Sequence, residues 1–313
     1  MKKHSFKTFI TFVLICGFMT SQAQINPEIA KSSIKIEMLF PGGKSKALIL
    51  SFDDSPTADR RLVKLMNQYD LKGTFHLNSN KFGEPNYVTK AEVKTLYAGH
   101  EVSVHSANHP NLPDIKKIDV IAELLEDRKA LEKLVGYPVR GMAYPFGNYN
   151  DEVIDVVKDL NIEYARTVED SYNFAIPKNF LKWEPTVHQF CSAYFKPNQP
   201  EVDKKEMLRF NQVIADFMKA DTLALLDIWG HSWENGDGSK WGDVESYFKI
   251  LAHQPNICYT THINLVDYIN AYRNLKFTVN KDAVENHSAI NVFIKINKEI
   301  YEIPAGGRMV LGN

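Results

Sequence analysis

Short apolar runs typical of β-strands alternate with longer helical patterns over most of this 313-residue chain, and no other feature limits its fold as much. Six or seven such repeats predict parallel strands with helices packed outside them, because right-handed crossovers return each helix to the face of the sheet. The fold class is therefore α/β. The alternation alone does not separate a closed barrel from an open doubly wound sheet. We predict strands at residues 47–52, 73–78, 100–105, 140–145, 162–167, 223–229 and 257–261.

The segments between these strands carry helix signals. In the first of them, Leu62, Leu65 and Met66 fall on one apolar stripe, and Pro56 stands just before it, where proline favours a helix start. We predict helices at residues 58–69, 89–97, 118–135, 151–160, 203–219, 244–252 and 265–275.

The two ends of the chain depart from this pattern. Residues 1–23 combine a basic start, an apolar run too short to span a bilayer comfortably, and small residues at Ser21 and Ala23. This pattern predicts a secretory signal peptide, with an uncleaved anchor as the alternative. We therefore expect an exported protein, periplasmic or secreted, without stable membrane insertion after cleavage. Residues 24–276 would form the α/β domain, and period-two alternation predicts a small β-rich appendage over 277–313.

Charge and cysteine content narrow the function classes. The chain has 37 basic and 38 acidic residues without a basic block, so a nucleic-acid partner has no support. Cys191 and Cys258 remain after signal cleavage, and both a disulfide and a buried free pair are open.

The chemistry-bearing residues follow two predicted strands. Asp53 and Asp54 come at the end of the first strand, and His105 and His109 follow the third with a spacing of four. Strand ends are where α/β folds collect functional side chains. Taken separately, the aspartates are also good helix-capping residues and the histidines ordinary surface residues. Together, Asp54 and the two histidines suit Zn²⁺, Co²⁺ or another divalent ion, and Asp53 remains available as a base.

Four segments together carry a family resemblance. Ser51–Asp54 resembles the first signature of the polysaccharide deacetylase (NodB-homology) family, carbohydrate esterase family 4, and residues 105–109 match its second, H-[ST]-x-x-H. Residues 140–147 are similar to its third signature and residues 226–232 to its last. The resemblance spans roughly residues 47–272.

This resemblance implies a distorted (β/α) barrel of about seven strands with a divalent metal at their carboxyl ends. It implies an enzyme that removes N-acetyl, or else O-acetyl, groups from an acetylated polysaccharide or cell-wall glycan. The roles it implies are metal ligation by Asp54, His105 and His109, general base for Asp53, general acid for His231, and oxyanion binding at the turn containing Tyr144 and Phe146.

The chain departs from the family pattern at three places. Ala143 stands where the third signature normally has an arginine, so Arg140 or Arg166 is expected to take its place beside Asp53. The fourth signature has no clear counterpart, and Trp183 is either an aromatic wall of the site or part of the core.

The acid-bearing segment is the third departure. Its Trp229 and Trp233 are expected to stack on a sugar face, and Glu234 or Asp227 to tune His231. His76 is expected in the core or lining the site, and His188 and His262 are weaker candidates for lining the cleft.

Two alternative functions stay open: hydrolysis of a small amide in the same fold, and non-catalytic carbohydrate binding at the cell surface.

Overall fold

The computed structural model of this chain describes residues 35–189, 200–236, 238 and 240–311. The predicted signal peptide and Cys191 lie outside these ranges. Cys258 is a free thiol, and burial raises its pKa to about 11.

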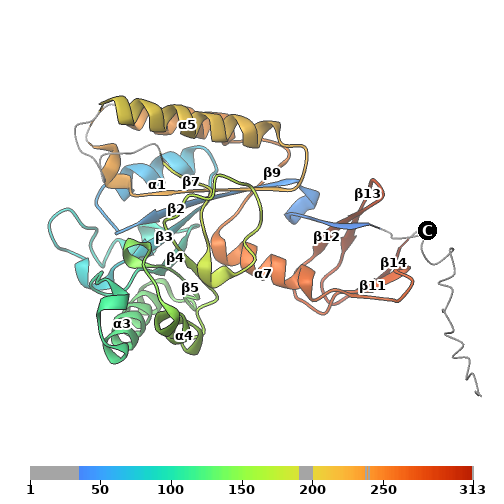
Figure 1. Ribbon diagram of the computed structural model, residues 1–313, viewed down its shortest axis with the longest axis horizontal. Helices are drawn as coiled ribbons and strands as arrows, with labels where there is room; N and C mark the ends of the chain where they lie inside the picture. Colours follow the sequence, from blue (N-terminus) through green and yellow to red (C-terminus); the bar gives the residue numbers. More distant parts are fainter. Residues whose placement is uncertain (1–34, 190–199, 237, 239, 312–313) are drawn as a thin grey trace, which may run out of the picture. The chain divides into compact units, whose positions relative to one another are not determined.

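A curled parallel sheet forms the centre of the described chain (Figure 1). Its strand order is β6-β5-β4-β3-β2-β8-β7, and β9 pairs with the first three residues of β2. The predicted α/β class and barrel-like fold are confirmed. The strands are β2 Lys46–Asp53, β3 Gly73–Leu77, β4 Glu101–Val104, β5 Gly141–Ala143, β6 Tyr164–Arg166, β7 Val187–His188, β8 Ala224–Gly230 and β9 Ile257–Tyr259.

One extended segment joins the two edges of this sheet. At its start, the backbone of Trp183 bonds to β6, donating to Ala165 O at 3.0 Å and accepting from Thr167 N at 2.8 Å. A few residues later, Val187 of β7 pairs with Ile228 of β8. The segment therefore connects β6 to β8 and completes the barrel. Sequence patterns did not predict β7, because two residues are too few to show a period.

Helices cover the outside of the sheet, with α5 beside β7 and α3 beside β4 (Figure 1). The predicted helices are present with shifted ends; the largest change is at residues 89–97, where only Val93–Leu96 is α-helical. The helices are α1 Asp59–Gln68, α2 Val93–Leu96, α3 Lys117–Val135, α4 Asp151–Asp159, α5 Pro200–Lys219, α6 Lys240–Leu251 and α7 His262–Arg273. Short 3-10 turns lie at Pro41–Gly43, Ser79–Lys81, Leu112–Asp114, Pro145–Gly147, Phe180–Lys182 and Ser232–Asn235.

Period-two alternation divides each strand between an apolar outer face and a polar interior. On β2, Leu48, Leu50 and Phe52 belong to the apolar core shared with the helices, whereas Ser51 and Asp53 alternate with them and are also buried. The strands β3, β4 and β8 repeat this pattern. Buried polar side chains therefore fill the barrel interior: Thr74, His76, Glu101, Ser103, Arg166 and Asp227.

The tail forms the predicted β-rich appendage, with one unexpected member. The strand β1 (Ile36–Leu39), near the start of the described chain, pairs antiparallel with β12 (Val292–Ile296), and β12 pairs with β13 (Glu299–Ile303). A second sheet has the order β10-β11-β14, with strands Lys276–Phe277, Ala283–Glu285 and Arg308–Val310. Among the described residues, no helix has the length and apolar character needed to cross a bilayer.

Candidate active site

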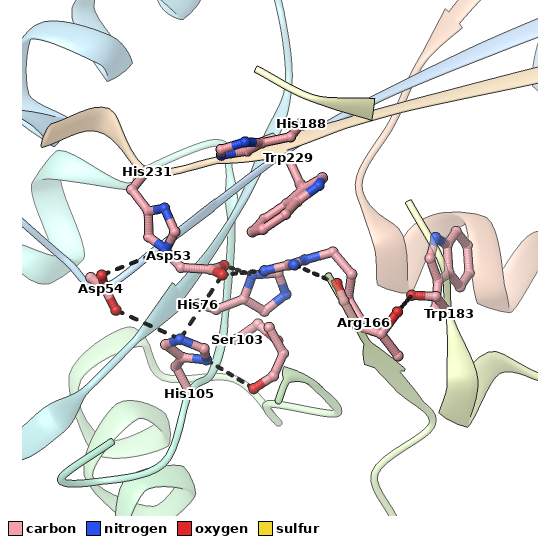
Figure 2. A network of polar contacts seen from close by, with 12 residues as sticks. Asp53, Asp54, His76, Ser103, His105, Arg166, Trp183, His188, Trp229 and His231 are labelled. Atoms are coloured by element: carbon pink, nitrogen blue, oxygen red, sulfur yellow. Dashed lines mark hydrogen bonds and ion pairs between the residues drawn. The ribbon is translucent and has the colours of Figure 1, made fainter. Parts of the chain in front are cut away.

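The functional side chains meet at the carboxyl ends of the barrel strands (Figure 2). Asp53 is the last residue of β2, Arg166 ends β6, and His105 and His231 directly follow β4 and β8. This is the edge at which parallel α/β folds place their sites.

Several loop residues at this edge adopt left-handed backbone conformations that non-glycine residues rarely take. Positive φ angles occur at Asp54 (77°), Ser55 (55°), Ser106 (63°), His109 (62°) and Phe146 (58°). Such conformations cost about 1–3 kcal/mol each and persist where the surroundings hold them. Local hydrogen bonds do so here: Asp54 N donates to His76 O at 3.1 Å, and His109 N donates to Ser106 Oγ at 3.1 Å.

Asp54, His105 and His109 converge on one point. Asp54 Oδ1 lies 3.6 Å from His105 Nε2 and 3.7 Å from His109 Nε2. These separations are too long for good hydrogen bonds but suit three ligand atoms arranged around one ion. The three residues form a candidate metal-binding group, with one carboxylate and two imidazoles.

The surroundings of the two imidazoles fit this role. His105 Nδ1 lies 2.9 Å from Ala143 O, so Nδ1 carries the proton and the lone pair of Nε2 faces Asp54. Burial, with His105 nearby, lowers the pKa of His109 to about 4, which keeps its ring neutral as ligation requires. The donor set therefore fits a divalent ion such as Zn²⁺.

Asp53 is a buried carboxylate held at both oxygens. Its Oδ1 lies 2.9 Å from His76 Nδ1, and its Oδ2 accepts a hydrogen bond from the Arg166 guanidinium. Burial alone would raise the pKa of Asp53, but Arg166, His105 and His76 more than offset it and hold that pKa well below its usual range. Asp53 is therefore ionised, and since an ionised carboxylate only accepts, His76 Nδ1 carries a proton.

Strand register explains how Arg166 reaches this place. Ala143 of β5, at the position where the family has its arginine, is paired with Arg166 of β6. The guanidinium thus enters the site from the neighbouring strand. It also donates to Thr167 O at 2.7 Å and lies 4.8 Å from the centre of the Trp229 ring.

Two expected site residues lie elsewhere. Arg140 precedes β5, at the opposite end of the barrel, and pairs with Glu163 at 2.9 Å and Asp267 at 2.6 Å, so the expectation that it supports Asp53 is wrong. Trp183 is fully buried and donates to Asp227 Oδ2 at 2.9 Å. It fills the barrel interior and is not an aromatic wall of the site.

His231 approaches the candidate metal group from β8. Its Nε2 lies 3.7 Å from Asp54 Oδ2, and its Nδ1 lies 3.0 Å from Glu234 Oε1. Burial would lower the pKa of His231, but Glu234 and the nearby aspartates raise it to about 9. His231 is therefore a protonated imidazolium at neutral pH, as a general acid must be.

Glu234 is also paired with His188. Both of its oxygens lie 3.1 Å from His188 Nε2. Burial would raise the pKa of Glu234, but His188 and His231 lower it to about 2. Of the two residues expected to tune His231, Glu234 does so, whereas Asp227 bonds to Trp183 and to His262 Nε2 at 3.0 Å. His262 is thus inside the barrel and does not line the cleft.

A cavity of about 160 Å³ opens above these groups. Tyr144, Phe146 and Trp229, which the sequence singled out for substrate or oxyanion binding, all line it. Trp229 is fixed by a 2.8 Å bond from its indole N–H to Asp170. The remaining lining residues are Asp53, Asp54, His105, His109, Val168 and His231.

The sequence alone does not identify His76 as a partner of Asp53. The signal was available in principle, because Asp53 and His76 are register partners on adjacent strands, but register is a property of the folded sheet. Beyond His76, the interior network continues. His76 Nε2 lies 3.5 Å from the Tyr164 hydroxyl, which donates to Glu101 at 2.7 Å.

Comparison with known proteins agrees with this geometry. Residues 41–165 match the family model described as polysaccharide deacetylase. The chain is 26% identical over 151 residues to the peptidoglycan-N-acetylglucosamine deacetylase PgdA of Listeria monocytogenes, covering 47% of this chain and 32% of that protein. It is 29% identical over 146 residues to a peptidoglycan-N-acetylglucosamine deacetylase of Bacillus cereus, covering 45% and 51%. The chain thus spans between about a third and a half of the length of these curated relatives.

Two solved structures share the fold. A putative polysaccharide deacetylase from Mycobacterium smegmatis aligns with a TM-score of 0.60 at 14% identity, covering 77% of this chain and 96% of that one. The chitin deacetylase of Colletotrichum lindemuthianum aligns with a TM-score of 0.50 at 19% identity, covering 71% and 87%. The residues that match the polysaccharide deacetylase model, 41–165, include Asp53, Asp54, His105 and His109.

Proposed function

We propose that this protein is an exported, metal-dependent hydrolase that removes acetyl groups from a polysaccharide or cell-wall glycan. One observation carries the proposal: Asp54, His105 and His109 converge beside the ionised Asp53, with the protonated His231 on another side of Asp54. Base, acid and metal group thus line one cavity. The peptidoglycan deacetylases and the chitin deacetylase among the similar proteins support an N-acetylated glycan as substrate, with O-acetyl groups as a further class.

Asp54, His105 and His109 would hold the ion, Zn²⁺ by preference, with Co²⁺ or another divalent ion as alternatives. A divalent ion bound there supplies a Lewis acid for the acetyl carbonyl and lowers the pKa of water. His105 is oriented for ligation by its bond to Ala143 O.

The protein's own groups divide the proton transfers. Asp53, held by His76 and Arg166, would accept the proton of the attacking water as the C–O bond forms. His231 would give its proton to the departing amine as the C–N bond breaks, so that acetate and a free amino sugar result. The backbone of the turn at Phe146 would help to stabilise the oxyanion, a contribution of about 3–4 kcal/mol per donor in other enzymes.

The position of Arg166 bears on the non-catalytic alternative. Loss of catalysis would be expected if Ala143, in place of the family's arginine, left Asp53 without a cation. Arg166 instead brings a guanidinium to Asp53 from the next strand. A protein that only binds glycans requires neither this contact nor the Glu234–His231 pair.

Acetate release from acetylated glycans, with small amides in the same panel, tests the proposal. We expect glycan deacetylation that a chelator removes and Zn²⁺ restores. Asp53→Asn should lower kcat by about 10²–10⁴-fold, the usual contribution of a general base, while retaining the metal. Full activity after verified metal removal, or turnover of small amides alone, would contradict the proposal.

A further inference from the structure

We propose that two carboxylates of α3, Asp127 and Glu123, are positioning residues for the candidate metal group. They hold the turn at residues 105–109, here called the ligand turn, which carries two of the three ligands of that group. This inference rests on the proposed function and adds to it the groups that fix the two histidines in place.

The ligand turn requires support from outside itself. Ser106 and His109 have left-handed φ angles of 63° and 62°, and such conformations persist only where the surroundings hold them. The bond from His109 N to Ser106 Oγ lies within the turn. It therefore cannot fix the turn relative to the end of β2, where Asp54 supplies the third ligand.

Asp127 holds the first end of the ligand turn. Its side chain is fully buried, its Oδ2 accepts from His105 N at 3.0 Å, and its Oδ1 accepts from Ser79 N at 2.8 Å. The His105 N–H is shared with Leu77 O of β3, also 3.0 Å away. The carboxylate thus joins the backbone just after β4 to the backbone just after β3, at the residue that carries the first imidazole.

Glu123 holds the second end of the same turn. It lies one helical turn before Asp127, so the two side chains share a face of α3. Its Oε2 accepts from Asn108 N at 2.8 Å, and its Oε1 accepts from Asn108 Nδ2 at 2.7 Å. The backbone carbonyl of Glu123 also accepts from Ala107 N at 3.2 Å. Both carboxylate oxygens therefore bind the residue directly before His109.

The environment of Asp127 indicates a specific role for its charge. Within the described part of the chain, no lysine or arginine forms an ion pair with Asp127 or Glu123, and burial raises the pKa of Asp127 to about 7. Burying a carboxylate without a cation is unfavourable. An apolar side chain would avoid this cost but would leave the N–H of Ser79 without its partner.

Zinc affinity is the first measurement, because it requires no turnover. Zinc binding is measured by competition with a chromogenic chelator at about pH 8, above the pKa of about 7 of Asp127, for wild type, Asp127→Asn and Glu123→Ala. Each variant should bind zinc about 10–100-fold more weakly, the usual effect of losing a group that orients a metal ligand. The visible absorption spectrum of the cobalt-loaded variants should also differ from that of wild type, since it reports ligand geometry.

Two variants separate positioning from charge. Glu126→Gln removes the same charge from an exposed position of α3 and should change neither affinity nor spectrum. Glu123→Gln removes the charge but keeps one carbonyl oxygen that can accept from Asn108, so its zinc affinity should lie between those of wild type and Glu123→Ala. Equal losses in Glu123→Gln and Glu123→Ala would assign the effect to charge and overturn the positioning role.

Urea unfolding of each variant shows whether the sample is folded. Asp127→Asn alters a buried group, whereas Glu123 is only partly buried. If Asp127→Asn does not fold, the comparison of Glu123→Ala with Glu123→Gln decides the proposal.

Acetate release by the wild type keeps the two proposals apart. Variants with the zinc affinity and cobalt spectrum of wild type would overturn the positioning role while leaving the deacetylase. Weaker zinc binding in the variants, with no acetate release from any glycan by the wild type, would support the positioning role and overturn the proposed function. A wild type that binds no zinc would overturn both.

Discussion

At the scale of single residues, the site depends on how each ionisable group is paired. Asp53 is kept ionised in a buried position by Arg166 and His76, and His231 is kept protonated by Glu234. One carboxylate and one imidazole, both buried, thus hold the opposite protonation states that base and acid require.

Replacement of Glu234 by Gln tests this division. The pKa of His231 is about 9 with Glu234 ionised beside it, and removing that charge lets burial lower the pKa. A general acid works only while protonated, so the basic limb of the kcat/KM profile should move to lower pH. The pH dependence of kcat/KM is measured by acetate release from about pH 5 to about pH 10.

His188→Gln is the matched control for that profile, because it leaves the bond between Glu234 and His231 in place. Its basic limb should move less than that of Glu234→Gln. Equal shifts in the two variants would show that Glu234 does not act directly on His231.

At the scale of elements, pairing between neighbouring strands decides which residue supports the base. β5 and β6 are parallel, and their register sets Ala143 beside Arg166. The same side of this strand pair can therefore offer a guanidinium from either strand. This explains how the motif can lack its arginine while Asp53 still has one.

Arg166→Ala followed by Ala143→Arg tests this interchange. The single variant leaves the buried Asp53 without its main cation, which should cost about 3–5 kcal/mol of stability and raise the pKa of Asp53. Since the base must be ionised, the acid limb of the activity profile should move to higher pH. The double variant should regain part of the stability and activity, measured by urea unfolding and acetate release.

Ala143→Arg in an otherwise unchanged chain is the control for the double variant. It should be destabilised, because Ala143 is fully buried and Arg166 already fills the space. A double variant no better than Arg166→Ala would show that the two strand positions are not interchangeable.

At the scale of the whole molecule, the β-rich appendage joins distant parts of the chain. The Tyr268 hydroxyl of α7 donates to Leu39 O of β1 at 2.6 Å and accepts from Phe293 N of β12 at 2.9 Å. A single buried hydroxyl thus links the barrel's last helix to both strands. These bonds give the appendage a defined place on the barrel.

Tyr268→Phe should lower the free energy of unfolding by about 1–3 kcal/mol, because it leaves the buried Leu39 carbonyl and the part-buried Phe293 N–H without this partner. Acetate release at saturating substrate should not change, since Tyr268 does not line the cavity at Asp53 and Asp54. Urea denaturation and a kinetic assay on the same sample measure both quantities. Lower kcat with unchanged stability would contradict this assignment of Tyr268 to stability alone.

Local patterns predicted a large part of this protein. Strand–helix alternation identified the barrel strands of three or more residues, and the spacing of Asp54, His105 and His109 identified the candidate metal group. Both are short-range signals, since the period of a strand and the residues that end it lie within a few positions of each other.

Contacts between distant segments were decided only in the folded chain. Strand register places Arg166, and not Arg140, beside Asp53, and it pairs His76 with Asp53. The bridge between β6 and Trp183 at the barrel closure buries the Trp183 side chain. So does the pairing of β1 with β12, whose residues stand near opposite ends of the described chain. Hydrophobic period specifies which face of a strand is buried, but the residue that lies opposite is set by packing of the whole barrel, which no local pattern encodes.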